Sequence, residues 1–130
     1  MASGGEEAKM KWLIATAFTL IAMPAFAAET MTGDELEGLL GTDKTITLSR
    51  PETAMSGEIA FKSDGTASGT IKSAGKTEQV TGVWYIEGNE FCYTWKGIKA
   101  GTEVCETWLK DGPNKARVLV KGKEVGVNTW

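Results

Sequence analysis

Residues 91–108 read FCYTWKGIKAGTEVCETW, two runs of alternating apolar and polar residues joined by a loop that contains two glycines. Alternating runs on either side of such a loop are typical of a β-hairpin. If the hairpin folds about the midpoint of the loop, Cys92 lies opposite Cys105. Opposed Cα atoms in an antiparallel pair are about 4.5–5.5 Å apart, within disulfide range. The stretch therefore predicts a cross-strand disulfide between Cys92 and Cys105.

The N-terminal region has the form of a secretory signal peptide. Lys11 precedes an apolar run at residues 12–23, and an A-x-A box follows at residues 25–27. We expect residues 1–27 to be a cleaved signal peptide, because the run is too short to cross a membrane. Two acids occur before Met10, where such peptides are normally basic, so we expect translation to start at Met10. The predicted location is periplasmic or secreted, an oxidising environment that agrees with the disulfide.

Composition limits what the mature chain, residues 28–130, can be. Its length fits a single domain. The full chain carries 17 acidic and 14 basic residues and a net charge of −3, with no continuous basic stripe, which argues against nucleic acid or an anionic membrane as the partner. It contains no histidine, so it lacks the bases of Ser-His-Asp and Cys-His catalysis, and both thiols are committed. We expect no enzymatic activity, no cofactor and no metal site.

The mature chain begins with one short helix. Thr32 and Glu35 have the spacing of a capping box, and Leu36, Leu39 and Leu40 then fall on one helical face before a glycine. From there on, short alternating runs separated by glycine-containing breaks predict strands. The runs are residues 45–49, 57–62, 66–72, 77–86, 90–96, 103–109, 115–121 and 124–127. The predicted fold is mainly β, an eight-stranded up-and-down barrel preceded by one short helix, since closure removes exposed edges.

The turns predict which side chains face inward. Turns at residues 63–65, 72–77 and 88–89, together with the disulfide hairpin, carry one apolar set across five strands. The last hairpin has two registers: an odd-numbered loop near residues 111–114 places Val118 inside, an even one Leu119. Composition favours the first. The large aromatic members of the inward set are Trp84, Phe91, Tyr93, Trp95 and Trp108.

Glu106 breaks this apolar pattern, since the register places it opposite Phe91, where an unpaired carboxylate would be costly. Either it accepts hydrogen bonds from an indole or an arginine as a structural plug, or it points into a small polar cavity; the only arginines are Arg50 and Arg117. The aromatic residues likewise form either a filled core or the mouth of a pocket. The candidate ligand-binding residues are Trp84, Tyr93, Trp95, Glu106 and Trp108.

Several motifs resemble those of small exported alphaproteobacterial proteins of lipocalin-like fold, a largely uncharacterised group. They are a hairpin F-x-x-D-G-T at residues 61–66, a G-x-W strand at residues 82–84, and G-N-x-x-C-x-x-W at residues 88–95 followed by a second cysteine. A more distant likeness is to periplasmic metalloprotease inhibitors, lipocalin-like barrels whose free N-terminal segment enters the protease. The resemblance implies the architecture and does not indicate an activity.

We therefore expect a periplasmic, monomeric, non-enzymatic binding protein for a small apolar ligand or an envelope component. The alternative is a periplasmic inhibitor of a protease or lysozyme that acts through its loops or its N-terminal segment. A cavity in the barrel would favour the first function. A packed interior with an ordered, protruding loop would favour the second.

Overall fold

The structure is a computed structural model that describes residues 29–97 and 101–130. The predicted signal peptide, residues 1–27, lies outside the described residues. Within the described ranges, none of the helices has the length and apolar character needed to cross a membrane.

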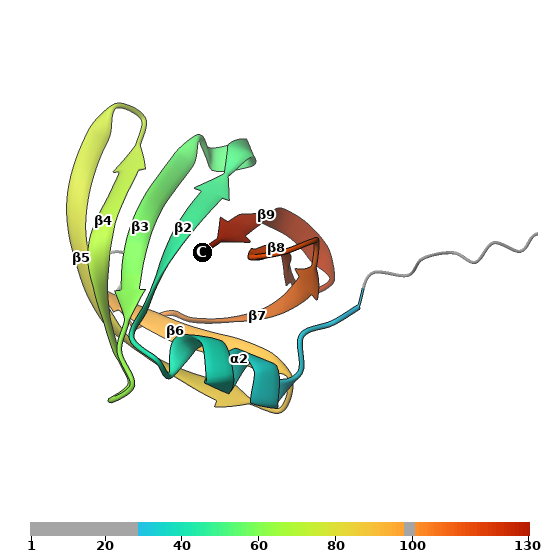
Figure 1. Cartoon of the computed structure of the whole chain (residues 1–130). Coiled ribbons are helices and arrows are strands. Elements are labelled where there is room, and N and C mark those ends of the chain that lie inside the picture. The colour runs from blue at the N-terminus through green and yellow to red at the C-terminus, as the bar shows by residue number, and fades with distance from the viewer. Residues whose placement is uncertain (1–28, 98–100) are drawn as a thin grey trace, which may run out of the picture.

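The described residues form a closed antiparallel barrel in which every strand pairs with its neighbours in the chain (Figure 1). The strands are β2 (Lys44–Arg50), β3 (Met55–Phe61), β4 (Thr66–Ser73), β5 (Lys76–Glu87), β6 (Glu90–Lys96), β7 (Glu103–Lys110), β8 (Lys115–Val120) and β9 (Lys123–Thr129). Leu48 of β2 pairs with Asn128 of β9 and closes the barrel. The predicted eight-stranded up-and-down barrel is thus confirmed, with strand ends shifted by at most two residues.

The predicted registers are confirmed along the chain. Phe61 pairs with Ala67, Trp84 with Tyr93, and Cys92 with Cys105. In the hairpin of β7 and β8, Trp108 pairs with Val118, so the loop near residues 111–114 has an odd number of residues. Val118 is fully buried, as this register predicts. The inward face of the barrel is therefore the apolar face that the turns predict.

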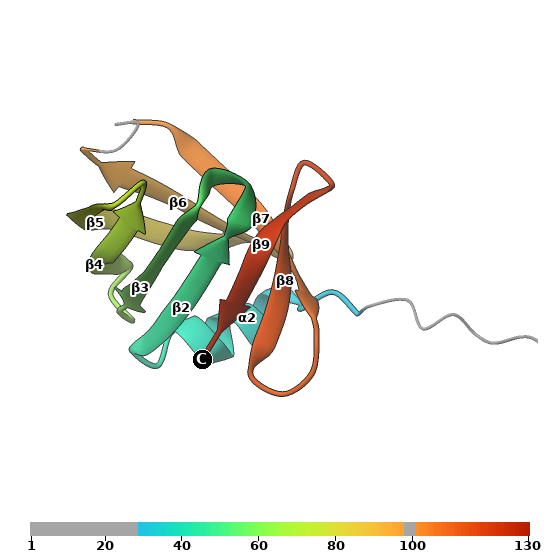
Figure 2. The same cartoon turned by 90° about the horizontal axis from the view of Figure 1, so that it is seen from above.

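One helix closes one end of the barrel. The helix α2 (Gly33–Leu40) lies across the end that carries the turn between β5 and β6, as Figures 1 and 2 show from two directions. The capping box between Thr32 and Glu35 forms as predicted. Leu36 and Leu40 are fully buried in the barrel core. The other end carries the connections from β2 to β3 and from β8 to β9. We call this open end the mouth.

The segment before the helix is fixed to β7. The amide of Met31 donates to the carbonyl of Trp108 (2.8 Å), and the amide of Lys110 donates to the carbonyl of Glu29 (2.7 Å). Lys110 also forms an ion pair with Glu35, with 2.6 Å between Nζ and Oε2. Residues 29–31 thus extend the barrel wall along the last residues of β7.

A short 3₁₀ helix at the mouth was missed by the sequence prediction. The helix η2 (Pro51–Thr53) connects β2 to β3 and is followed by Ala54 in the left-handed conformation (φ 50°). Proline at the first helical position is pre-organised for such a turn. Pro51 was therefore the signal that could have found it.

Candidate functional site at the barrel mouth

The end of the barrel next to the helix is a packed aromatic core. Trp84 meets Phe61 edge-on, with ring centroids 6.3 Å apart, and Phe61 meets Phe91 edge-on at 5.2 Å. The indole N–H of Trp84 donates to the carbonyl of Lys62 (3.0 Å). Trp84, one of the candidate ligand-binding residues, thus lies in this core and does not line the mouth.

Trp108, a second candidate, is also a core residue. It is fully buried, and its ring stacks on the C-terminal Trp130 with centroids 6.0 Å apart. Its indole Nε1 donates to Oε1 of Glu106 (3.0 Å). Trp108 therefore acts on the mouth only through the carboxylate that it holds.

Glu106 lies at the base of the mouth and is only 2% exposed. Besides the Trp108 indole, it accepts a hydrogen bond from the hydroxyl of Tyr93 at Oε2 (2.9 Å). The guanidinium Nη2 of Arg50 is 3.4 Å from the same oxygen. The expectation that Glu106 accepts from an indole or an arginine is confirmed, because it does both. Three donors offset the cost of burying its charge.

Arg50, the last residue of β2, is held by the closure of the barrel. Its Nη1 donates to the carbonyl of Ser49 (3.0 Å), the carbonyl of Val127 (3.4 Å) and Oδ1 of Asn128 (3.0 Å). Arg50 is 9% exposed and Asn128 is buried. Among the residues that the structure describes, Nε and the second N–H of Nη2 have no hydrogen-bond partner. Arg50 is thus a nearly buried cation that keeps unused donors.

Gly126 makes room for this arginine. A Cβ at Gly126 would lie 2.8 Å from Cδ and 2.9 Å from Nη1 of Arg50, and 2.0 Å from the carbonyl oxygen of Ser49. We expect Gly126→Ala to destabilise the protein by about 1–3 kcal/mol, as overpacked interiors do. The matched control is Gly38→Ala in the helix, where nothing lies within 4 Å and no loss is expected. Urea denaturation checks both, and equal midpoints for the two variants would show that the Ser49 carbonyl and Arg50 both move aside freely.

Tyr93 and Trp95 form the aromatic wall of the mouth. Their ring centroids are 5.4 Å apart, and Trp95 lies over Gly82, where a Cβ would come within 2.6 Å of the ring. Burial raises the pKa of Tyr93, and the negative charge of Glu106 and the hydrogen bond to it raise this pKa further. Tyr93 therefore keeps its proton and holds Glu106 from the mouth side.

This raised pKa has a testable consequence. A tyrosine whose pKa is higher in the folded than in the unfolded protein stabilises the fold fully below the unfolded pKa, and this stability is lost as pH rises above that value, about 10. Since the chain has two tyrosines, Tyr85→Phe leaves Tyr93 alone. We expect its tyrosinate absorbance to appear only when the protein unfolds in alkali. A titration with a midpoint near pH 10 in the folded variant would contradict the buried geometry.

The mouth contains an inner cavity and an outer hollow. The inner cavity measures about 40 Å³ and is lined by Arg50, Tyr93, Trp95 and Glu106 among others, so it has room for a few waters only. The outer hollow measures about 210 Å³, is open to solvent, and shares Arg50, Tyr93 and Glu106 with the inner cavity. The barrel beyond is filled by side chains. A bound group would therefore lie at the mouth and not deep in the barrel.

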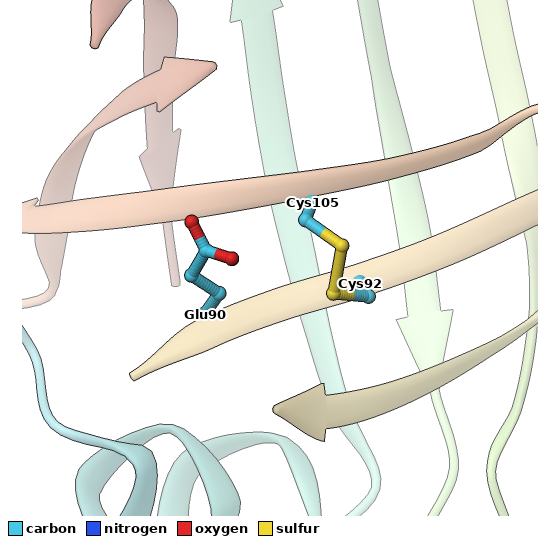
Figure 3. A group of neighbouring side chains, drawn as sticks. All are labelled: Glu90, Cys92 and Cys105. Carbon is cyan, nitrogen blue, oxygen red and sulfur yellow. A yellow bond between two sulfur atoms is a disulfide. The ribbon is translucent and has the colours of Figure 1, made fainter. Parts of the chain in front are cut away.

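The disulfide joins Cys92 of β6 to Cys105 of β7 (Figure 3) and lies on the outer face of the sheet, because the two cysteines alternate with the inward-facing Phe91 and Glu106. Although it lies on this outer face, Cys92 is itself fully buried. One potential ligand atom of Glu90 and the two sulfurs lie within 4.8 Å of one another, as a metal site would require. Both sulfurs are bonded to each other, however, so neither offers the thiolate that a metal needs.

The structure brings together Tyr93, Trp95 and Glu106 of the predicted site and leaves Trp84 and Trp108 in the core. Arg50 was expected only as one of two potential partners of Glu106, and Asn128 was missed because the last strand was expected to end at residue 127. No protein-family model matches the chain, and no curated protein or solved structure is significantly similar to it, so the mouth is interpreted from its own geometry.

Proposed function

We propose that this protein is an exported, non-enzymatic binding protein of the lipocalin-like class that holds a small ligand, or one group of an envelope component, at the mouth of its barrel. The observation that carries the proposal is Arg50. It is nearly buried, it faces an open hollow, and two of its N–H groups have no partner among the described residues. Buried donors without partners are costly, and a ligand that accepts from them removes that cost.

The buried ion pair supports the same proposal. Removing a guanidinium and a carboxylate from water costs several kcal/mol per ion, and apolar residues of similar size often stabilise a fold equally well. Arg50 and Glu106 lie 3.4 Å apart, a long ion pair for so buried a position. An apolar pair at these two positions would serve the fold as well. A charged pair at a cost in stability is therefore typical of a functional site.

The packed interior favours binding at the mouth over enclosure of an apolar ligand. The inner cavity of about 40 Å³ is far below the roughly 300–1,000 Å³ of sites that enclose drug-sized molecules. The outer hollow, about 210 Å³, accepts a smaller group and leaves the rest of a larger molecule outside. An envelope component that inserts one group fits this geometry better than a wholly enclosed lipid.

The alternative function is inhibition of a protease or lysozyme, which a packed interior also favours. Residues 29–31 are hydrogen-bonded to β7, so this part of the N-terminal segment is not free to enter an active site. An inhibitor built on this barrel would instead act through connections at the mouth, such as η2 and the turn between β8 and β9.

Native mass spectrometry tests the proposal. The protein is purified under non-denaturing conditions from the cells that make it, next to a Val120→Trp variant. Val120 lines the outer hollow but takes no part in the hydrogen bonds of Glu106, so a larger side chain there fills the hollow and leaves the network intact. We expect a bound small molecule or envelope fragment on the wild type and none on the variant.

Two results would count against the proposal. Wild-type protein that is free of any adduct, from cells that express it at native levels, would leave the mouth without a ligand. A complex with an intact protease or lysozyme would replace the binding function by the inhibitor function.

A further inference from the structure

The charges at the mouth are balanced in pairs. Arg50 faces Glu106 at 3.4 Å, and at the rim Glu52 faces Lys123 at 3.7 Å. The charged residues that line the outer hollow are Arg50, Glu52 and Glu106, and Lys123 balances the remaining acid. A charged ligand would therefore be repelled by the residues of like charge at the mouth. The residues of opposite charge, which could attract it, already form ion pairs.

The unused donors at the base of the hollow belong to Arg50. The Tyr93 hydroxyl already donates its hydrogen bond to Glu106. Glu106 also accepts hydrogen bonds from Trp108 and Arg50. Within the described ranges, Arg50 keeps its Nε–H and one Nη2–H. A ligand ammonium would lie beside the Arg50 cation, and it would find a carboxylate that already accepts three hydrogen bonds. A ligand carboxylate would find donors, but it would lie beside two carboxylates.

Part of the wall of the hollow is apolar. Met55, Val120 and Val125 line it above the charged base, and all three are partly buried. A volume of about 210 Å³ is smaller than that of a site for a drug-sized molecule. The complementary group therefore has a short apolar part and one oxygen that accepts a hydrogen bond.

We propose that the mouth is selective for an uncharged amphiphilic group that carries an amide or ester carbonyl, with its oxygen accepting from Arg50 and its alkyl part against Met55, Val120 and Val125. This inference rests on the proposed binding function and names the chemical class of the ligand. The balanced charges of the mouth disfavour ions, and the unused donors of Arg50 match an acceptor.

Three probes with the same alkyl chain and different head groups test the selectivity at neutral pH: hexanamide, hexanoate and hexylammonium. The readout is the shift of the Arg50 Nε–H and Trp95 indole signals in ¹H–¹⁵N NMR spectra of the full mature chain. We expect saturable shifts with hexanamide in the millimolar range. Because a like charge at an interface costs several kcal/mol, the two ions should bind at least about tenfold more weakly.

The Val120→Trp variant is the control for location and should lose the hexanamide shifts while its spectrum stays dispersed. Equal or tighter binding of hexanoate or hexylammonium at the same signals would overturn the selectivity and leave binding at the mouth intact. Absence of shifts with all three probes, or shifts that persist in Val120→Trp, would also overturn the inference. In those cases the native mass spectrometry described above tests separately whether the mouth binds a ligand.

Discussion

Glu106→Ala is expected to destabilise the protein by about 3–5 kcal/mol, because it removes one partner of a buried ion pair and leaves the other charge uncompensated. Arg50 is 9% exposed and would lose its only carboxylate contact among the described residues, while the buried Trp108 indole and the Tyr93 hydroxyl would lose their acceptor. This loss is a large part of the stability of a domain of about 100 residues.

The same substitution series separates charge from hydrogen bonding. Glu106→Gln keeps an oxygen acceptor and nearly the same volume, so it should cost less than Glu106→Ala. Glu106→Leu keeps the volume but no acceptor, so it should cost nearly as much as Ala. Chemical denaturation gives the three free energies of unfolding. Midpoints unchanged from the wild type in all three variants would mean that Glu106 is not buried against these partners.

Reduction of the Cys92–Cys105 disulfide is expected to cost about 3 kcal/mol, because the bond closes a loop with a sequence separation of 13 residues and restricts the unfolded chain. For a domain of about 100 residues this corresponds to a fall in melting temperature of more than about 10 °C. The bond pairs β6 with β7 beside the loop that joins them, where those strands share only a short ladder.

Calorimetry of the oxidised protein and of protein reduced with a phosphine measures this difference. The intact mass of the non-reduced sample should show the loss of two hydrogens and a linked peptide that contains both cysteines. A Cys92→Ala, Cys105→Ala double variant should melt close to the reduced protein. Free thiols in protein freshly purified without reductant, or equal melting temperatures before and after reduction, would contradict the role assigned to the bond.

The wall of the barrel was predictable from the sequence because short turns fix registers. Once the turn at residues 88–89 is placed, the pairing of Trp84 with Tyr93 follows, and the loop of the next hairpin places Cys92 opposite Cys105 and Phe91 opposite Glu106. Each register also had to keep one apolar face inward, and a slip of one residue would have reversed every side chain. The registers that the turns fix and the registers that bury the apolar residues are therefore the same.

The candidate site was less predictable because it depends on closure. No turn joins β2 to β9, so no local pattern places Arg50 beside Asn128 and above Glu106. The sequence showed that Glu106 needed a partner and that only two arginines were available, but not which one the closed barrel would supply. The position of Trp130 on Trp108 is likewise set by closure.

In our proposal, the ion pair of Arg50 and Glu106 at the base of the mouth is retained for binding. The most direct test is native mass spectrometry of an Arg50→Met, Glu106→Leu double variant, with its free energy of unfolding measured alongside. Because an apolar pair often replaces a buried ion pair at little cost, we expect it to recover most of the stability that Glu106→Ala loses. We also expect it to carry no adduct. A folded double variant that retains the adduct of the wild type would contradict the claim.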